Sequence, residues 1–226
     1  TSSDALFRVY DVRTTTFFTA LILCSLNSVC TKLSIDVAGM PHDVLRDLNI
    51  VRRCAADFLL REKSGKWSWN YWSRRSPEAR TMPYPDDLDD TALAVRAFYG
   101  YDQSLVPPAA LAAVARTLIA AETKEGGPYR TWCVPPEYPK FGADVDPAVN
   151  ANIRGLIADL GMTLPNLDTY LTERLKSGEI HSPYYPNCYS FLYFLAGVVS
   201  PAKSLTVSSL NAFSSENLRN LALRYC

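Results

Sequence analysis

Four aspartates occupy positions 86, 87, 89 and 90, within the stretch PYPDDLDDTA at 83–92. Carboxylates this close raise one another's pKa, because each negative charge disfavours the ionisation of its neighbours. Such a cluster can bind a hard cation such as Mg²⁺ through its oxygens, or it can keep one carboxyl group protonated near neutral pH. It can also stabilise the start of a helix by capping free N–H groups, although one or two aspartates are enough for that purpose.

Two spacings within the cluster correspond to the two chemistries. Asp86, Asp87 and Asp90 form D-D-x-x-D, a pattern that can chelate Mg²⁺ bridging a diphosphate. Asp87, Asp89 and Asp90 form D-x-D-D, in which neighbouring carboxylates and an apolar wall disfavour the ionisation of one carboxyl group. A protonated aspartate beside an apolar cavity could then donate its proton to an alkene. The spacing alone leaves both chemistries open.

The elements that must position this cluster are helices. Apolar residues recur at helical spacing along most of the chain, and no segment shows a sustained period of two, so the sequence predicts an all-α protein. The predicted helices cover about 14–29, 42–63, 89–101, 107–123, 147–161, 166–178, 187–199 and 208–225.

The predicted helices alternate in character. The first of each pair is poor in charge, as expected for a helix buried on most sides, and the second carries charges on one face, as expected for an outer helix. Four such pairs predict an (α/α) toroid or barrel of helical hairpins, with inner and outer helices. We expect one domain over 1–226, with a ring that is incomplete or completed by irregular segments.

Two long loops rich in aromatic residues and proline interrupt this pattern, at 66–85 and 125–147. Loops of this length usually form a functional rim or lid. Trp67, Trp69 and Trp72 lie in the first loop and Trp132 in the second, where they either pack over the core or line an apolar binding site.

Composition narrows the class of protein. Hydrophobic residues make up 48% and charged residues 20%, and 23 basic residues balance 23 acidic ones, so we expect a globular protein that does not bind nucleic acid. The six cysteines have no paired spacing, which predicts free thiols and a cytoplasmic protein. The apolar run at 17–26 is too short to span a bilayer, and no basic segment precedes it, so we interpret it as a buried helix rather than a signal peptide.

The segment LDDTALAVRAFYGYD at 88–102, together with Asp87, resembles the signature of class II terpene cyclases. In that family D-x-D-D-T-A opens an inner helix of an (α/α) toroid. The resemblance implies that Asp89 is the general acid that protonates a linear isoprenoid or isoprenoid diphosphate, while Asp87 and Asp90 orient it and tune its acidity. No metal or other cofactor is required for this step, although Mg²⁺ could assist the binding of a diphosphate.

The same resemblance implies aromatic rings that stabilise a carbocation by cation–π attraction. Our candidates for contact with the substrate are Trp69, Trp72, Tyr84, Trp132, Tyr184 and Tyr185. We add Asn150 because a buried amide on an inner helix needs a partner, and Asn150 or Asp144 could bond to the acidic cluster.

A second stretch, HSPYYPNCYSFLYFLAG at 181–197, resembles the last inner helix of toroidal prenyltransferase β-subunits. Those enzymes bind zinc with an Asp-x-Cys pair and a histidine. The matching positions here are Asp146-Pro147-Ala148, in which alanine replaces the cysteine, so we predict no metal site.

Departures from the cyclase pattern leave alternatives. The Q-x-x-x-G-x-W repeats of triterpene cyclases are absent, since Gln103 is the only glutamine. The alternatives are a non-catalytic module that binds an isoprenoid or a protein, and a Mg²⁺-dependent synthase that ionises a diphosphate with Arg74, Arg75 or Arg130 as anion partners.

The chain length leaves no room for the second helical domain that covers the active site of most relatives, so we expect that a homodimer could close the active site. Peripheral contact with a membrane would suit a lipid-like substrate.

Overall fold

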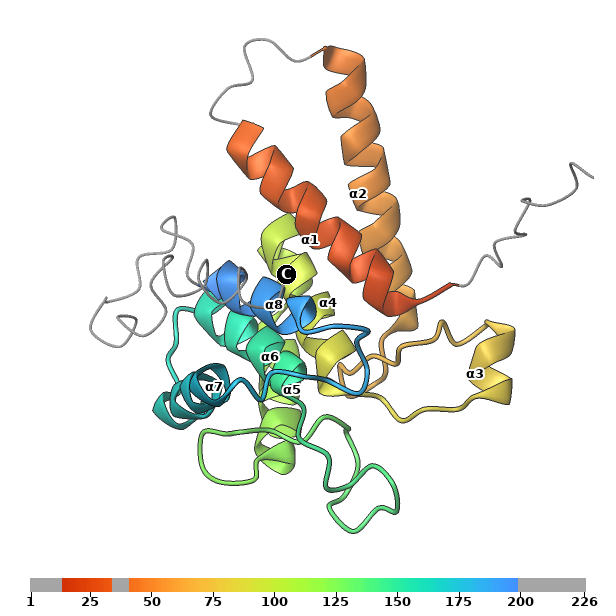
Figure 1. The fold of residues 1–226 in the computed structure, drawn as a ribbon. Helices are drawn as coiled ribbons and strands as arrows, with labels where there is room; N and C mark the ends of the chain where they lie inside the picture. Colours follow the sequence, from red (N-terminus) through yellow and green to blue (C-terminus); the bar gives the residue numbers. More distant parts are fainter. Residues whose placement is uncertain (1–13, 34–40, 199–226) are drawn as a thin grey trace, which may run out of the picture.

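The structure, a computed structural model, describes residues 14–33 and 41–198. These residues form eight α-helices, one 3-10 helix and no β-strand, which confirms the predicted all-α class for this part of the chain (Figure 1). The predicted helix at 208–225 lies outside the described residues. The helices are α1 (Thr16–Leu33), α2 (His42–Glu62), α3 (Pro77–Thr81), α4 (Leu88–Tyr101), η2 (Gln103–Leu105, the 3-10 helix), α5 (Pro108–Ala121), α6 (Pro147–Asp159), α7 (Pro165–Ser177) and α8 (Tyr189–Val198).

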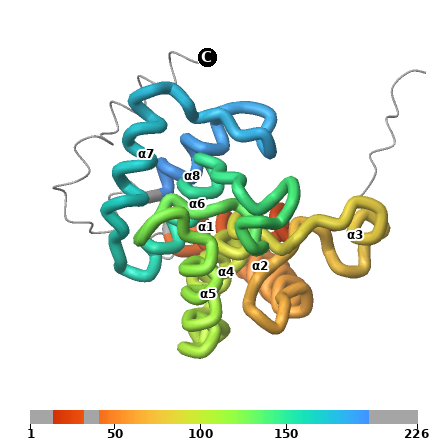
Figure 2. The backbone as a smooth tube through the Cα atoms, turned by 90° about the horizontal axis from the view of Figure 1, so that it is seen from below, coloured from red at the N-terminus to blue at the C-terminus, as the bar shows by residue number. Residues whose placement is uncertain are grey.

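Helices α1, α4, α6 and α8 are neighbours in succession: α4 packs between α1 and α6, and α6 packs against α8. They are the helices that the sequence predicts as inner, and we call them the inner helices. Helix α2 packs against α1 and α7 packs against α6, so these two outer helices accompany the inner ones (Figures 1 and 2). Two of the predicted pairs of inner and outer helices are thus present, α1 with α2 and α6 with α7, while the closed toroid stays a prediction.

Helix α4 is the most important element for the acidic cluster. Its N-terminal cap is Asp87, whose side-chain Oδ1 accepts a hydrogen bond from the backbone N–H of Asp90 at 2.7 Å. Every residue from Leu88 to Val95 is buried, so α4 is surrounded rather than amphipathic. A surrounded helix has no solvent-facing side at this end, and its first-turn carboxyl groups must therefore lie within the protein.

Helix α6 begins in the same way. Pro147 occupies the first turn, and Asp146 caps the helix by accepting hydrogen bonds from the N–H groups of Ala148 and Val149 at 2.7 and 3.0 Å. The helix is buried from Pro147 to Ala158. The match to the zinc-binding aspartate of prenyltransferases therefore falls on a residue that caps a buried helix.

Helix α1 differs from the prediction of a helix buried on most sides. Phe18 and Ile22 are 54% and 52% exposed, and Val29 is exposed on the same face. The opposite face, with Phe17, Ala20 and Leu23, is buried. In the described part of the chain α1 packs against α2 and α4, which cover only that opposite face.

The two aromatic loops meet at the start of α4. Isolated antiparallel bridges join Trp69 to Asp87 and Asp87 to Trp132, so the segment before α4 lies between the loops. The N–H of Asp87 donates to the carbonyl of Trp69 at 3.0 Å, and the N–H of Leu88 donates to the carbonyl of Thr131 at 2.8 Å. This backbone pairing places both loops around the acidic cluster. The first loop also contains the short helix α3, which the sequence analysis did not predict.

The remaining expectations concern cysteines and membranes. In the described residues the cysteines form no disulfide bond, as predicted: Cys24, Cys30, Cys54, Cys133 and Cys188. Among the helices that the structure describes, none has both the length and the apolar character needed to cross a membrane.

Candidate active site

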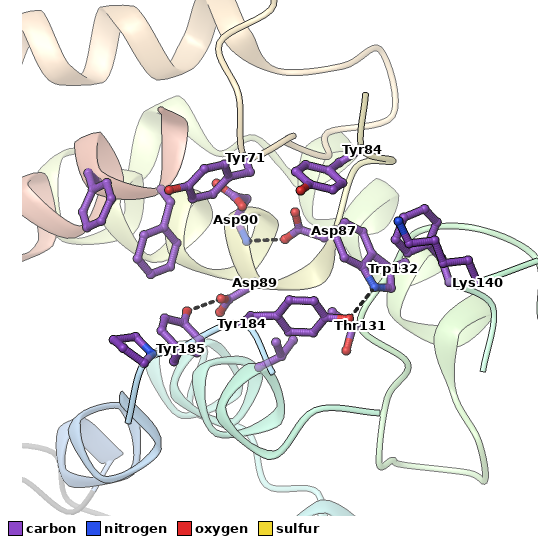
Figure 3. A pocket seen from close by; sticks show the side chains of 15 residues that line it. Tyr71, Tyr84, Asp87, Asp89, Asp90, Thr131, Trp132, Lys140, Tyr184 and Tyr185 are labelled. Carbon is purple, nitrogen blue, oxygen red and sulfur yellow. Dashed lines mark hydrogen bonds between the residues drawn. The ribbon is translucent and has the colours of Figure 1, made fainter. Parts of the chain in front are cut away.

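A cavity of about 460 Å³ opens at the N-terminal end of α4 (Figure 3). Its volume lies within the range of small-molecule sites in proteins. Residues from α1, both aromatic loops, the starts of α4 and α6, and the segment before α8 form its wall. The lining residues are Phe17, Phe18, Tyr71, Tyr84, Asp87, Asp89, Asp90, Thr131, Trp132, Lys140, Phe141, Val149, Tyr184, Tyr185 and Pro186.

Asp89 combines burial with exposure to this cavity. Its Oδ2 accepts a hydrogen bond from the hydroxyl of Tyr185, and its Oδ1 accepts one from Nδ2 of Asn152 at 2.8 Å (Figure 3 shows the Tyr185 contact). Burial raises the pKa of Asp89 to about 7, and the charge of Asp90 adds to the rise, while the two hydrogen bonds oppose it. A group with this pKa is protonated in a substantial fraction of molecules at neutral pH.

Asp87 and Asp90 flank Asp89 and are fixed in place by other contacts. Asp87 caps α4, and burial followed by the charges of Asp90 and Asp89 raises its pKa well above the usual range. Asp90 accepts a hydrogen bond from the hydroxyl of Thr16 on α1 at 2.6 Å, and burial also raises its pKa. Hydrogen bonds thus hold both carboxyl groups in place, and each lies close enough to Asp89 to interact with it electrostatically.

The fourth aspartate of the cluster is directed elsewhere. The Asp86 carboxylate accepts a hydrogen bond from the hydroxyl of Ser68 in the first loop, and Asp86 does not line the cavity. The residues that face the cavity are therefore Asp87, Asp89 and Asp90, which form D-x-D-D, and not the set that forms D-D-x-x-D. In the two described ranges, no three His, Cys, Asp or Glu side chains are grouped so that they could bind a metal ion.

Aromatic rings form most of the remaining wall. Trp132 contacts Phe141, Tyr184 and Tyr84, with ring centroids 4.6, 5.6 and 5.8 Å apart. On the other side, the ring of Tyr185 contacts Phe17 with centroids 5.9 Å apart. The predicted residues Tyr84, Trp132, Tyr184 and Tyr185 thus line the cavity together.

The wall is braced by a short chain of hydrogen bonds. Nε1 of Trp132 donates to the hydroxyl of Tyr184 at 3.1 Å (Figure 3). The same hydroxyl donates to Asp144 at 2.8 Å. Asp144 therefore bonds to an aromatic side chain, and not to the acidic cluster as the sequence suggests.

Two predicted tryptophans do not line the cavity. Trp69 is fully buried, packs against Phe98, and donates from Nε1 to the carbonyl of Leu59 at 2.9 Å. Trp72 lies behind Tyr71, with ring centroids 4.6 Å apart, and Tyr71 is the residue that reaches the cavity. Neighbouring side chains in an extended segment point to opposite faces, so only one of this adjacent pair can face the site.

Asn150 also lies away from the cavity. Its side chain donates to the carbonyls of Tyr129 and Asp146, both at 2.9 Å, and accepts from the N–H of Tyr129 at 2.8 Å. It holds the second loop to the start of α6. The amide that reaches the acidic cluster is Asn152, because residues two apart on a helix face different sides.

Several residues of the site escaped the sequence analysis: Phe17, Phe18, Tyr71, Thr131, Lys140, Phe141, Val149 and Pro186. Their positions in the sequence carry no special signal, apart from the aromatic character of the loops. Lys140 is the only basic residue that lines the cavity in the described ranges, and Figure 3 shows it beside Trp132. Arg130 instead donates to the backbone carbonyls of Ala120 and Glu122. The Nε of Arg74 donates to the backbone carbonyl of Glu62 at 2.9 Å.

The chemistry available to this arrangement is proton donation into an apolar space. The Asp89 carboxyl group, whose pKa is raised to about 7, lies at the wall of the cavity. Asn152 and Tyr185 donate hydrogen bonds that stabilise its carboxylate form, and aromatic residues line the volume where a cation would develop.

Comparison with known proteins adds one finding. Over 170 aligned residues, covering 71% of this chain, the sequence is 30% identical to the drimenol cyclase drtB of Aspergillus calidoustus. The chain spans 29% of the length of that relative. No family model matches the chain, and no solved structure matches it. At this low identity the similarity supports the resemblance to terpene cyclases found in the sequence.

Proposed function

We propose that the chain is a class II terpene cyclase, which protonates a linear isoprenoid or isoprenoid diphosphate with Asp89 as the general acid. The observation that carries this proposal is the Asp89 carboxyl group, with a pKa of about 7, at the wall of an aromatic cavity. An acid works best when its pKa lies near the working pH, because it is then both protonated and acidic enough. The similarity to a drimenol cyclase supports the same assignment.

The proposed step is a proton transfer. The π electrons of an alkene form a C–H bond with the proton on Oδ2 of Asp89, the O–H electrons remain on the carboxylate, and the other alkene carbon becomes a cation. Tyr185 and Asn152 then donate hydrogen bonds to the carboxylate. Further double bonds attack the cation and close rings, and loss of a proton from the product cation balances the reaction.

The aromatic wall would act on the cation that forms. The rings of Tyr84 and Phe141 contact Trp132, the ring of Phe17 contacts Tyr185, and all five residues line the cavity. Cation–π attraction in a site without water is worth about 2 kcal/mol per ring. These rings would also keep water from the cation until the rings of the product have closed.

The test is incubation of the purified chain with linear isoprenoid hydrocarbons, epoxides and diphosphates in D₂O, with Mg²⁺ or with a chelator, followed by mass spectrometry. We expect a cyclised product that carries one deuterium from the acid. It should disappear in Asp89→Asn and persist in the matched control Asp86→Asn, whose carboxylate bonds to Ser68 outside the cavity.

Other outcomes would select the alternatives. A product without deuterium that is lost with the chelator would favour Mg²⁺-dependent ionisation of a diphosphate. Unchanged isoprenoid binding by Asp89→Asn, with no product from any substrate in either protein, would favour a module that binds without catalysis.

A further inference from the structure

Arg96 is a partly buried cation among the inner helices. It belongs to α4, its side chain is 14% exposed, and its Nε forms a salt bridge with Asp159 of α6 at 3.0 Å. Cys24 of α1 and Tyr193 of α8 also lie close enough to interact with it electrostatically. All four inner helices therefore contribute to the surroundings of this one guanidinium group.

Arg96 also determines how a neighbouring amide is oriented. Its Nη1 donates to Oδ1 of Asn152 at 3.1 Å. A guanidinium group has only donors, so the Asn152 atom that faces it must be the oxygen. The NH₂ group must then face the other way, where it donates to the carbonyl of Asp89 at 3.0 Å and to Oδ1 of Asp89 at 2.8 Å.

We propose that Arg96 is a positioning residue: by fixing the Asn152 amide as a donor to Oδ1 of Asp89, it confines the acid proton to Oδ2, beside Tyr185 at the cavity. This inference rests on the proposed function of Asp89 as an acid. The hydroxyl of Tyr185 can accept as well as donate, so it tolerates a proton on Oδ2, whereas an N–H group facing Oδ1 does not tolerate one there.

A glycine makes room for this arrangement. A Cβ added at Gly155 of α6 would lie 2.5 Å from Nη1 of Arg96, closer than any real contact, so a side chain at 155 would displace the guanidinium. At Gly197 of α8 an added Cβ would lie 3.7 Å from Nη2, which is an ordinary contact. Both glycines therefore lie beside the guanidinium, but only Gly155 must lack a side chain for Arg96 to keep its position. Gly197 can serve as the matched control.

The consequence for Asp89 follows from the charges around it. Asp87 and Asp90 on its own helix, and Asp146 at the start of α6, oppose its ionisation, while the donors Asn152 and Tyr185 favour it. Without Arg96 no donor faces Oδ1 of Asn152, and only the carbonyl and Oδ1 of Asp89 still favour this orientation of the amide. When the amide turns and presents its oxygen, Asp89 loses a donor. Loss of a hydrogen bond to a charged group corresponds to a rise of roughly one unit in the pKa of Asp89.

The experiment measures Asp89 without substrate. Infrared spectroscopy of the full chain follows the C=O band of protonated Asp89, identified by its loss in Asp89→Asn, as the pH is varied. The variants are Gly155→Ala, with Gly197→Ala as its control, and Arg96→Met combined with Asp159→Asn, because a buried salt bridge is better removed whole. We expect the pKa of Asp89 to rise by about one unit in Gly155→Ala and in the double variant, and to stay unchanged in Gly197→Ala.

A purely structural role for Arg96 predicts a different result. Folded Gly155→Ala and double variants with an unchanged pKa of Asp89 would overturn the proposal, and if only one of the two folds, that variant decides. In an Asn152→Leu background the Gly155→Ala change should shift the pKa no further, because the amide through which Arg96 acts is gone. The titration needs no turnover, so it tests the role of Arg96 even if no isoprenoid is cyclised. The product assay tests the proposed function separately.

Discussion

Replacing Asp89 with asparagine should make the folded protein more stable at neutral and alkaline pH. Asp89 is buried, and its pKa rises from 3.8 in the free residue to about 7 in the folded chain. Each pKa unit corresponds to 1.36 kcal/mol of preference for the protonated form, so holding the ionised group in the fold costs about 4 kcal/mol above pH 7. Asparagine has nearly the same shape and cannot ionise.

The effect has a defined dependence on pH. Below about pH 3 Asp89 is protonated in nearly all molecules of both the folded and the unfolded chain, and its titration does not affect stability. Between pH 4 and pH 7 the unfolded chain ionises first, so the folded state loses stability as the pH rises. The loss is about 1.5 kcal/mol at pH 5 and about 4 kcal/mol at pH 8, which makes a difference of about 2–3 kcal/mol between these two conditions.

The assay is urea unfolding of the wild type and of Asp89→Asn at pH 5, 6, 7 and 8. Any change in packing or hydrogen bonding contributes equally at each pH. Asp87 and Asp90 titrate in both proteins, and burial, the largest cause of their raised pKa values, is the same in both. The advantage of the variant should therefore grow by about 2–3 kcal/mol from pH 5 to pH 8. A constant difference between the two proteins would refute the raised pKa of Asp89, and with it the physical basis of the proposed acid.

Two further predictions follow. The proposed acid, Asp89, must be protonated to act, so initial rates of cyclisation should fall about tenfold between pH 6 and pH 8. The rates are measured in matched buffers at saturating substrate, and a rate that rises over this range would contradict an acid with this pKa. Trp69→Phe should destabilise the fold by about 1–3 kcal/mol in urea unfolding, because the buried carbonyl of Leu59 loses its donor. The activity per folded molecule should stay unchanged, and a loss of activity without a loss of stability would indicate that Trp69 contacts the substrate.

The parts of the fold that the sequence predicts are those encoded by local patterns. The buried helix α4 could be predicted from the apolar and small residues that follow its first turn, and the start of α6 from the Asp146-Pro147 cap. The acidic cluster is also local, since four aspartates before a buried helix must lie at its first turn. The short helix α3 was missed because five residues are too few for a periodic signal.

The unpredicted parts of the site depend on which way a side chain points. Tyr71 and Trp72 are adjacent aromatic residues, and only the path of the loop decides that Tyr71 faces the cavity. Asn150 and Asn152 both look like buried amides in need of partners, but the roughly 200° of rotation between them sends one to the loop and the other to Asp89. Such choices are set by tertiary packing, which no local pattern contains.

The four aspartates of the cluster make different contacts, and this difference bears on whether the site is catalytic. Helix capping, considered at first as an alternative to chemistry, accounts for Asp87, and Ser68 and Thr16 bind Asp86 and Asp90. Asp89 is left with its carboxyl group toward the cavity and with a burial cost of several kcal/mol at pH 8. A protein that only bound an apolar ligand would gain from an uncharged residue at this position, since a buried carboxyl group destabilises the fold and makes no attractive charge interaction with an apolar chain. A destabilising group at a cavity is expected where the group performs a reaction, and this reasoning favours the acid over the binding module.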